Sequence, residues 1–113
     1  MHELSVAIGI VRIAENETKK AHAKKVEKIA LEIGTLAGIA FDSLDFVWPV
    51  AVKDTILEHA KREITIIQAK AKCIDCDTIF NVDNFYDACP ICSSNFKSII
   101  QGKELRVKSL EIV

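Results

Sequence analysis

The chain has 113 residues, of which 50% are hydrophobic and 27% are charged, and its formal net charge is −1. This length fits one domain, or one domain with a small appendage, and the composition is that of a globular protein. The near balance of 15 basic and 16 acidic residues gives no general attraction to nucleic acid or to an anionic membrane.

No apolar run is long enough to span a membrane, and the first residues lack the basic and apolar segments of a signal peptide. We therefore expect a cytoplasmic protein. In a reducing compartment, the four cysteines are expected to bind a metal ion and not to form disulfides.

The chain begins Met1-His2-Glu3, which places three nitrogens within chelating reach of one ion. They are the α-amine of Met1, the backbone nitrogen of His2 and one imidazole nitrogen of His2. Fused small chelate rings hold these nitrogens close to one plane, which suits Ni(II) or Cu(II) better than zinc. The Glu3 carboxylate adds a nearby oxygen. Taken alone, a histidine at position 2 is also what a frayed terminus can carry by chance.

Two helices are predicted from the spacing of apolar residues. The first covers residues 4–20, where apolar side chains recur at helical intervals and leave little of the surface polar. The second covers residues 41–55, with Asp42 or Ser43 near its start. Pro49 lies inside this pattern and is expected to kink the helix or to remove one hydrogen bond.

Three strands are predicted, over residues 26–33, 62–72 and 103–113, where apolar and polar residues alternate. The apolar residues in the two halves of the last strand are out of phase with each other. A shift of one residue turns side chains to the opposite face, so we expect a bulge near Lys108 and Ser109.

These elements predict an α+β fold, with a three-stranded sheet and two helices. Because the cysteines lie between the second and third strands, the main domain is expected to be discontinuous. It would comprise residues 1–71 and 100–113. Residues 72–99 would form a small inserted zinc-ribbon-like domain.

The insert contains two C-x2-C pairs, Cys73 with Cys76 and Cys89 with Cys92. Each pair can present two thiolates from one tight turn, and two such turns make the closed tetrahedral site typical of structural zinc. The insert has too few other apolar residues for a core of its own. We therefore expect it to need its metal ion in order to fold.

Two other uses of the cysteines compete with structural zinc. A redox dithiol needs only one pair. A nucleic-acid-binding ribbon is disfavoured because four acids and one base lie between Cys73 and Lys97, a surface that would repel phosphate. The alternative that stays open is a zinc-ribbon adaptor recognising protein or nucleic acid. No catalytic motif is present, and a closed four-thiolate site has no open position for substrate, so we predict a non-enzyme.

Several segments of the chain together resemble one family. They are the start MHELS, the segment LEIGTLAG at residues 31–38, the two cysteine pairs and the ending GKELRVKSLE at residues 102–111. In this order, over essentially the full length, the chain resembles the HypA/HybF family of hydrogenase-maturation nickel chaperones. It departs from the family pattern after each cysteine pair, where Asp77 and Ser93 replace the usual glycine.

The resemblance implies a nickel-binding α+β domain and a smaller zinc domain. It implies delivery of Ni(II) to the large subunit of nickel–iron hydrogenase, and in some relatives to urease, together with the nucleotide-hydrolysing partner HypB. Carried over residue by residue, His2 is the essential nickel ligand, assisted by the Met1 amine and nearby backbone nitrogens, with Glu3 adjacent. The four cysteines hold Zn(II) in a structural site. No nucleic-acid or membrane partner is expected, and the protein is expected to be a monomer or a weak homodimer.

Overall fold

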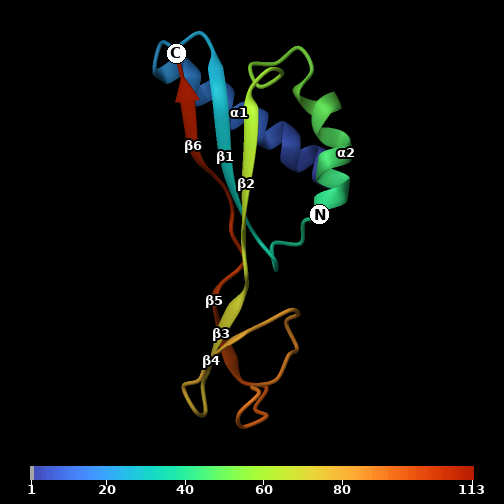
Figure 1. Ribbon diagram of the computed structural model, residues 1–113, viewed down its shortest axis with the longest axis vertical. Coiled ribbons are helices and arrows are strands. Elements are labelled where there is room, and N and C mark those ends of the chain that lie inside the picture. The colour runs from blue at the N-terminus through green and yellow to red at the C-terminus, as the bar shows by residue number, and fades with distance from the viewer. Residues whose placement is uncertain (1) are drawn as a thin grey trace. The chain divides into compact units, whose positions relative to one another are not determined.

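The computed structural model describes residues 2–113, which form two helices and six strands (Figure 1). In chain order these are α1 (Glu3–Lys20), β1 (Val26–Gly34), α2 (Phe41–Val52), β2 (Lys61–Ile67), β3 (Lys70–Cys73), β4 (Ile79–Asn81), β5 (Lys97–Gln101) and β6 (Leu105–Ile112). The strands form two three-stranded sheets, in the orders β2-β1-β6 and β4-β3-β5. No helix in the described part is long and apolar enough to cross a membrane.

The chain divides into two compact units. The first, here called the helical unit, comprises the residues up to Leu31 together with Ile39–Thr65 and Arg106–Val113, and it includes both helices. The second, here called the cysteine unit, comprises Glu32–Gly38 and Ile66–Leu105, and it includes the β4-β3-β5 sheet. The predicted α+β class, with two helices and a three-stranded sheet, is confirmed.

The core of the helical unit lies between the helices and one face of β1. The first helix forms where it was predicted, and β1 alternates as expected from Ile29 to Ile33, with buried side chains on one face and half-buried ones on the other. Packing of an apolar helical stripe against an apolar sheet face is the arrangement that the sequence pattern favours. The buried residues of α1 are Ala7, Ile10, Val11, Ala14 and Thr18, and the fully buried large residues of β1 within this unit are Val26, Ile29 and Leu31.

The N-terminus of α2 lies at Phe41, where it was predicted. Its N-cap is Ala40, which has an extended backbone (φ −84°, ψ 108°) and no side chain able to cap. Asp42 and Ser43, expected near the start of the helix, both fall within its first turn. The helix therefore starts without a capping side chain of its own.

The C-terminal end of α2 is earlier than expected. The helix continues through Pro49 and ends at Val52, whereas the sequence predicted residue 55. Lys53 leaves the helical region (φ −56°, ψ 132°), and the hydroxyl of Thr55 donates a hydrogen bond to the Val52 carbonyl at 2.7 Å. A side chain thereby satisfies one of the carbonyls that every helix end leaves free.

The single strand predicted over residues 62–72 is wrong, because it is two strands in different sheets. At the break, the Ala69 N–H donates to the Thr35 hydroxyl at 3.0 Å, and the Ala69 carbonyl accepts from the Val82 N–H at 3.0 Å. The Gln68 side-chain amide donates to the Val82 carbonyl at 3.1 Å. These contacts come from distant parts of the chain, so the local alternation of residues could not reveal the break.

The predicted third strand starts two residues late, and an unpredicted strand, β5, precedes it. The first residue after β5 is Gly102, with φ +111°. A Cβ on Gly34 would lie 2.0 Å from the Gly102 carbonyl oxygen, and a Cβ on Gly102 would lie 2.3 Å from the Ala69 Cα. Three backbone segments of the cysteine unit therefore meet more closely than any side chain would permit.

Exposure along β6 follows the predicted change of phase. Val107, Leu110 and Ile112 are half-buried, and two exposed residues, Lys108 and Ser109, separate the first of them from the others. The bulge itself stays a prediction.

The cysteine unit is larger than the insert expected over residues 72–99. The segment Glu32–Gly38 belongs to it, because the Gly34 N–H donates to the Glu104 carbonyl at 2.8 Å and the Leu36 N–H donates to the Gly102 carbonyl at 2.7 Å. These backbone bonds join the end of β1 to the segment that follows β5.

Candidate metal sites

The four cysteines lie in two turns that repeat the same backbone pattern. In the first turn, the Asp77 N–H donates to the Cys73 carbonyl at 3.0 Å, and the Cys73 N–H donates to the Thr78 carbonyl at 2.9 Å. In the second, the Ser93 N–H donates to the Cys89 carbonyl and the Cys89 N–H donates to the Ser94 carbonyl, both at 2.9 Å. The repeated bonds explain why the C-x2-C spacing presents two sulfurs from each turn.

Asp77 and Ser93, the two residues that depart from the family pattern, have equivalent conformations. Their φ values are +61° and +62°. Glycine adopts this left-handed region without a steric penalty, whereas other residues are strained there and aspartate is among the better tolerated. The turns therefore form without glycine, at a cost in backbone strain.

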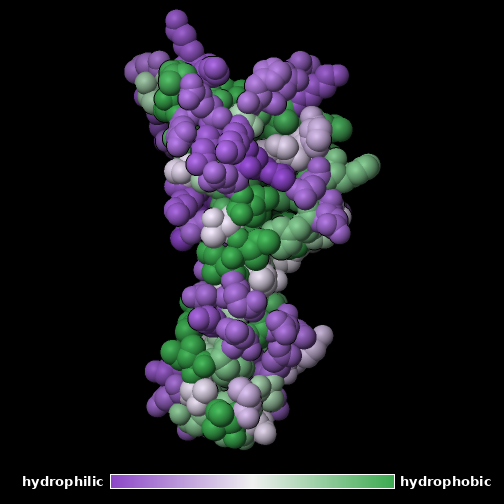
Figure 2. Space-filling model, in the orientation of Figure 1, coloured by the Kyte–Doolittle hydropathy of each residue, from purple (hydrophilic) through white to green (hydrophobic). Residues whose placement is uncertain are grey.

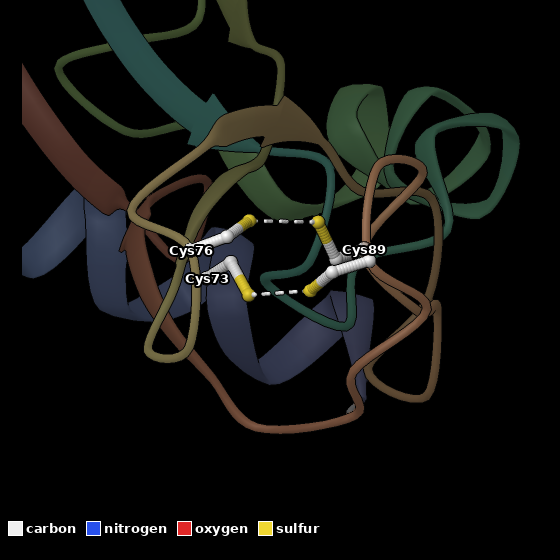
Figure 3. Close-up of side chains that lie close together, drawn as sticks. Cys73, Cys76 and Cys89 are labelled. Carbon is white, nitrogen blue, oxygen red and sulfur yellow. Dashed lines mark hydrogen bonds between the residues drawn. The ribbon is translucent and has the colours of Figure 1, made fainter.

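The four sulfur atoms point into one space between the two turns (Figure 3). The Sγ atoms of Cys73 and Cys92 are 3.5 Å apart, those of Cys76 and Cys89 are 3.6 Å apart, and all four lie within 4.8 Å of one another. A disulfide would require about 2.05 Å. A Zn–S bond of about 2.3 Å places tetrahedral sulfurs about 3.8 Å apart. The donor set and its spacing therefore fit a four-thiolate metal site.

The environment of the thiols also favours replacing protons by a metal ion. The hydroxyl and then the backbone N–H of Thr78 stabilise the thiolate of Cys76 and lower its pKa to about 6. The Ser94 backbone N–H acts in the same direction on Cys92, but the thiol of Cys73, burial and the other two thiols outweigh it and raise the pKa of Cys92 to about 12. Four adjacent thiols cannot all ionise without a cation, and a divalent ion removes this conflict.

The core around the site is small. Its buried residues are Ala69, Ala71, Cys73, Phe80, Val82 and Cys89, with Leu36 and Ile99 packed against them. Several large apolar side chains stay exposed nearby, and hydrophobic surface is visible on this unit in Figure 2. Two of the six buried residues are themselves cysteines of the cluster, so few other buried side chains are available to stabilise this unit.

The predicted nickel ligands lie at the start of α1. Met1 is outside the described residues. His2 is exposed and is the N-cap of α1, with φ −80° and ψ 108°, and its carbonyl accepts the Val6 N–H at 3.1 Å. Its side chain makes no capping hydrogen bond. The imidazole and the backbone nitrogen of His2 therefore take no part in the hydrogen bonding of the helix.

The Glu3 carboxylate has a different partner. Its Oε2 accepts a hydrogen bond from the Ala40 N–H at 3.2 Å, 37 residues along the chain. The structure therefore brings Glu3 to the start of α2. Within the described residues, the four cysteines are the group of side chains close enough together to hold a metal ion, and neither His2 nor Glu3 belongs to it.

Thr78 and Ser94 are two residues of the cysteine site that the sequence analysis missed. The Thr78 hydroxyl is 3.1 Å from the Cys76 sulfur, and the Ser94 hydroxyl bonds to the Asp75 carboxylate. Both residues follow the second cysteine of a pair at the same interval. This repeated hydroxyl was a signal available in the sequence.

Comparison with known proteins gives consistent matches over the whole chain. The family described as "Hydrogenase/urease nickel incorporation, metallochaperone, hypA" matches residues 1–112. A hydrogenase maturation factor HypA of Francisella philomiragia is 43% identical over 110 residues, 97% of each chain. Another, of Parabacteroides distasonis, is 41% identical over 112 residues, 99% of this chain and 97% of the other.

The fold has a counterpart among solved structures. The solution structure of the Ni metallochaperone HypA from Helicobacter pylori matches with a TM-score of 0.70 and 27% identity, covering 100% of this chain and 98% of that one. Sequence and fold therefore agree along the full length. The chain belongs to the HypA family of hydrogenase/urease nickel-incorporation metallochaperones, which are not enzymes.

Proposed function

We propose that this protein binds Ni(II) at its N-terminus, through the nitrogens of Met1 and His2 with Glu3 adjacent, and delivers it for maturation of nickel–iron hydrogenase, with urease as a further acceptor. The observation that carries the proposal is the position of His2. Its side chain is exposed, and only its carbonyl is used by α1. The Met1 amine and the two His2 nitrogens then chelate the ion in one plane, a geometry that suits Ni(II).

An exposed terminal chelate also suits transfer. An acceptor can approach the ion directly, whereas an enclosed site would have to open first. Nickel competes with protons for the amine, imidazole and amide nitrogens, so lowering the pH weakens binding and favours release.

The second part of the proposal assigns Zn(II) to the four cysteines. Four thiolates complete a tetrahedral shell, so this site has no position left for a cargo ion or a substrate. The turns around it are closed by backbone hydrogen bonds. Its role in this proposal is to stabilise the cysteine unit, while nickel exchanges at the helical unit.

The proposed partners follow from the maturation role. They are a HypB-type nucleotide-hydrolysing protein and the large subunit of nickel–iron hydrogenase. We propose that the protein binds them in the cytoplasm, as a monomer or a weak homodimer. The names of the relatives, which are hydrogenase maturation factors, support this assignment.

Nickel titration of the untagged, zinc-loaded protein tests the proposal. We expect one Ni(II) per chain with the absorption of a planar nitrogen-ligated ion. The His2→Ala variant is expected to lose nickel binding by at least about 100-fold, because it removes one nitrogen and the chelate ring that nitrogen closes. Zinc content, measured by elemental analysis, should stay unchanged.

His59→Ala is the matched control, because His59 is another exposed histidine of the helical unit. It should bind nickel as the wild type does. An N-terminal tag that blocks the Met1 amine should reproduce the loss caused by His2→Ala. Undiminished nickel binding by His2→Ala would overturn the proposal.

A further inference from the structure

Glu3, the residue that follows His2, is hydrogen-bonded to the start of the second helix. It is the first residue of α1, and its Oε2 accepts the Ala40 N–H at 3.2 Å. Ala40 is the N-cap of α2, and its own carbonyl already accepts the Leu44 N–H at 3.0 Å. Both polar backbone groups of Ala40 are thus engaged.

This contact replaces a cap that α2 lacks. In a capping box, a glutamate or glutamine at the third helical position reaches back to the N–H of the N-cap residue. In α2 the third position is Ser43, and no side chain of this helix caps it. Glu3 supplies that carboxylate from another helix, at a terminus where the helix dipole favours negative charge.

We propose that Glu3 is a positioning residue of the N-terminal nickel site, acting through its bond to the Ala40 N–H and not as a nickel ligand. This inference rests on the proposed function. Glu3, which follows the chelating nitrogens, is held at α2, so the backbone of His2 has fewer conformations before nickel arrives. Ordering a binding segment in advance strengthens binding without adding a contact to the ligand.

His2 and Glu3 are adjacent in sequence, but they have different roles in this proposal. His2 supplies nitrogens to the ion, and Glu3 fixes the chain that carries them. A partner that displaces the start of α2 from Glu3 would loosen the nickel site, which couples docking on this part of the helical unit to release of the ion.

The test compares Glu3→Ala, Glu3→Gln and Ala40→Pro by the rate of nickel transfer to a chromogenic chelator. Glu3→Ala removes the acceptor and should release nickel about three- to tenfold faster, as expected for losing one exposed hydrogen bond of ordinary net strength. Glu3→Gln keeps an oxygen acceptor and should stay within about twofold of the wild type. Ala40→Pro removes the donor at a φ of −84°, close to the value that proline prefers.

The decisive comparison is the double variant of Glu3→Ala with Ala40→Pro. If the carboxylate acts through Ala40, the double variant should release nickel no faster than either single variant. The nickel absorption spectrum should be the same in all of them, and Glu15→Ala, which removes another exposed carboxylate of α1, should match the wild type.

A nickel ligand would behave differently. The inference is overturned if Glu3→Gln and Glu3→Ala both change the nickel spectrum while Ala40→Pro changes neither spectrum nor rate. Amide hydrogen exchange at Ala40 keeps the test valid even if Ala40→Pro does not fold. Protection should be lost in Glu3→Ala and kept when nickel binds to the wild type, whereas loss on adding nickel would show that the carboxylate moves to the ion.

The His2→Ala variant distinguishes a failure of the proposed function from a failure of the positioning role of Glu3. Nickel binding that survives His2→Ala would remove the site itself, whatever Glu3 does. Loss of nickel by His2→Ala with no effect of Glu3→Ala would leave the carrier role intact and reject only the positioning role.

Discussion

The four-cysteine site and the proposed nickel site hold their ligands in opposite ways. Each cysteine lies in a turn closed by backbone hydrogen bonds, and Cys73 and Cys89 are buried. His2 is exposed, its side chain is free of capping bonds, and a single bond from Glu3 ties the adjacent residue to α2. An ion enclosed by four such cysteines is retained, whereas an ion at an open terminus can be exchanged. The contrast is what a carrier with one structural and one transported metal requires.

Removing zinc should give the largest effect on this contrast. Structural zinc contributes on the order of 10 kcal/mol to the folding of small zinc modules. Chelation of the ion should therefore unfold the cysteine unit, whose core includes two of its ligands. In an amide-resolved NMR spectrum, signals of β3, β4 and β5 should collapse to the range of unfolded chain. Signals of α1 should stay dispersed.

The control for zinc removal is nickel removal, which should leave both sets of signals in place. If the signals of α1 collapsed together with those of the cysteine unit when zinc is removed, the folding of the helical unit would also depend on zinc.

Alanine substitutions at two glycines compare a crowded backbone position with an open one. Gly34→Ala places a Cβ 2.0 Å from the Gly102 carbonyl oxygen, and neither backbone can yield easily. We expect a loss of about 3 kcal/mol in the free energy of unfolding. Gly9→Ala, within α1, meets nothing within 4 Å. It should gain about 0.5–1 kcal/mol from the helix propensity of alanine.

Chemical denaturation with zinc bound measures both changes. Equal effects of the two substitutions would mean that the close approach of Gly34 and Gly102 does not constrain the folded protein.

The turns at the cysteines should become more stable when their strain is removed. Asp77→Gly and Ser93→Gly each place glycine at a positive φ and should raise stability by about 0.5–1 kcal/mol. The ion pair lost with Asp77 is weak, because Lys72 is 3.9 Å away and both side chains are exposed. Slower release of zinc to a competing chelator is the expected readout.

Ala88→Gly is the control for these turns, since Ala88 precedes Cys89 but lacks a positive φ. It should be neutral or slightly destabilising. If it slowed zinc release as much as the other two, relief of left-handed strain could not be the cause.

The features that the sequence predicted correctly depend on short stretches of chain. The C-x2-C spacing placed the four sulfurs together, and the apolar periods placed α1 and β1 to within a residue. Each of these patterns repeats over a few residues and reports a local geometry.

The features that the sequence did not predict depend on contacts between distant residues. The break at Ala69 is made by Thr35 and Val82, and the cap of α2 comes from Glu3. Ala40 carries no polar side chain, so nothing near it indicates how its N–H is satisfied. Such partners become visible only once the fold brings them together.

X-ray absorption at the nickel and zinc edges, on protein loaded with both metals, tests the two-site account most directly. The account predicts a zinc shell of four sulfurs at about 2.3 Å and a nickel shell of nitrogen and oxygen atoms with imidazole scattering. His2→Ala should abolish the nickel signal and leave the zinc spectrum unchanged. Sulfur in the nickel shell of the wild type, or a zinc shell altered by His2→Ala, would contradict it.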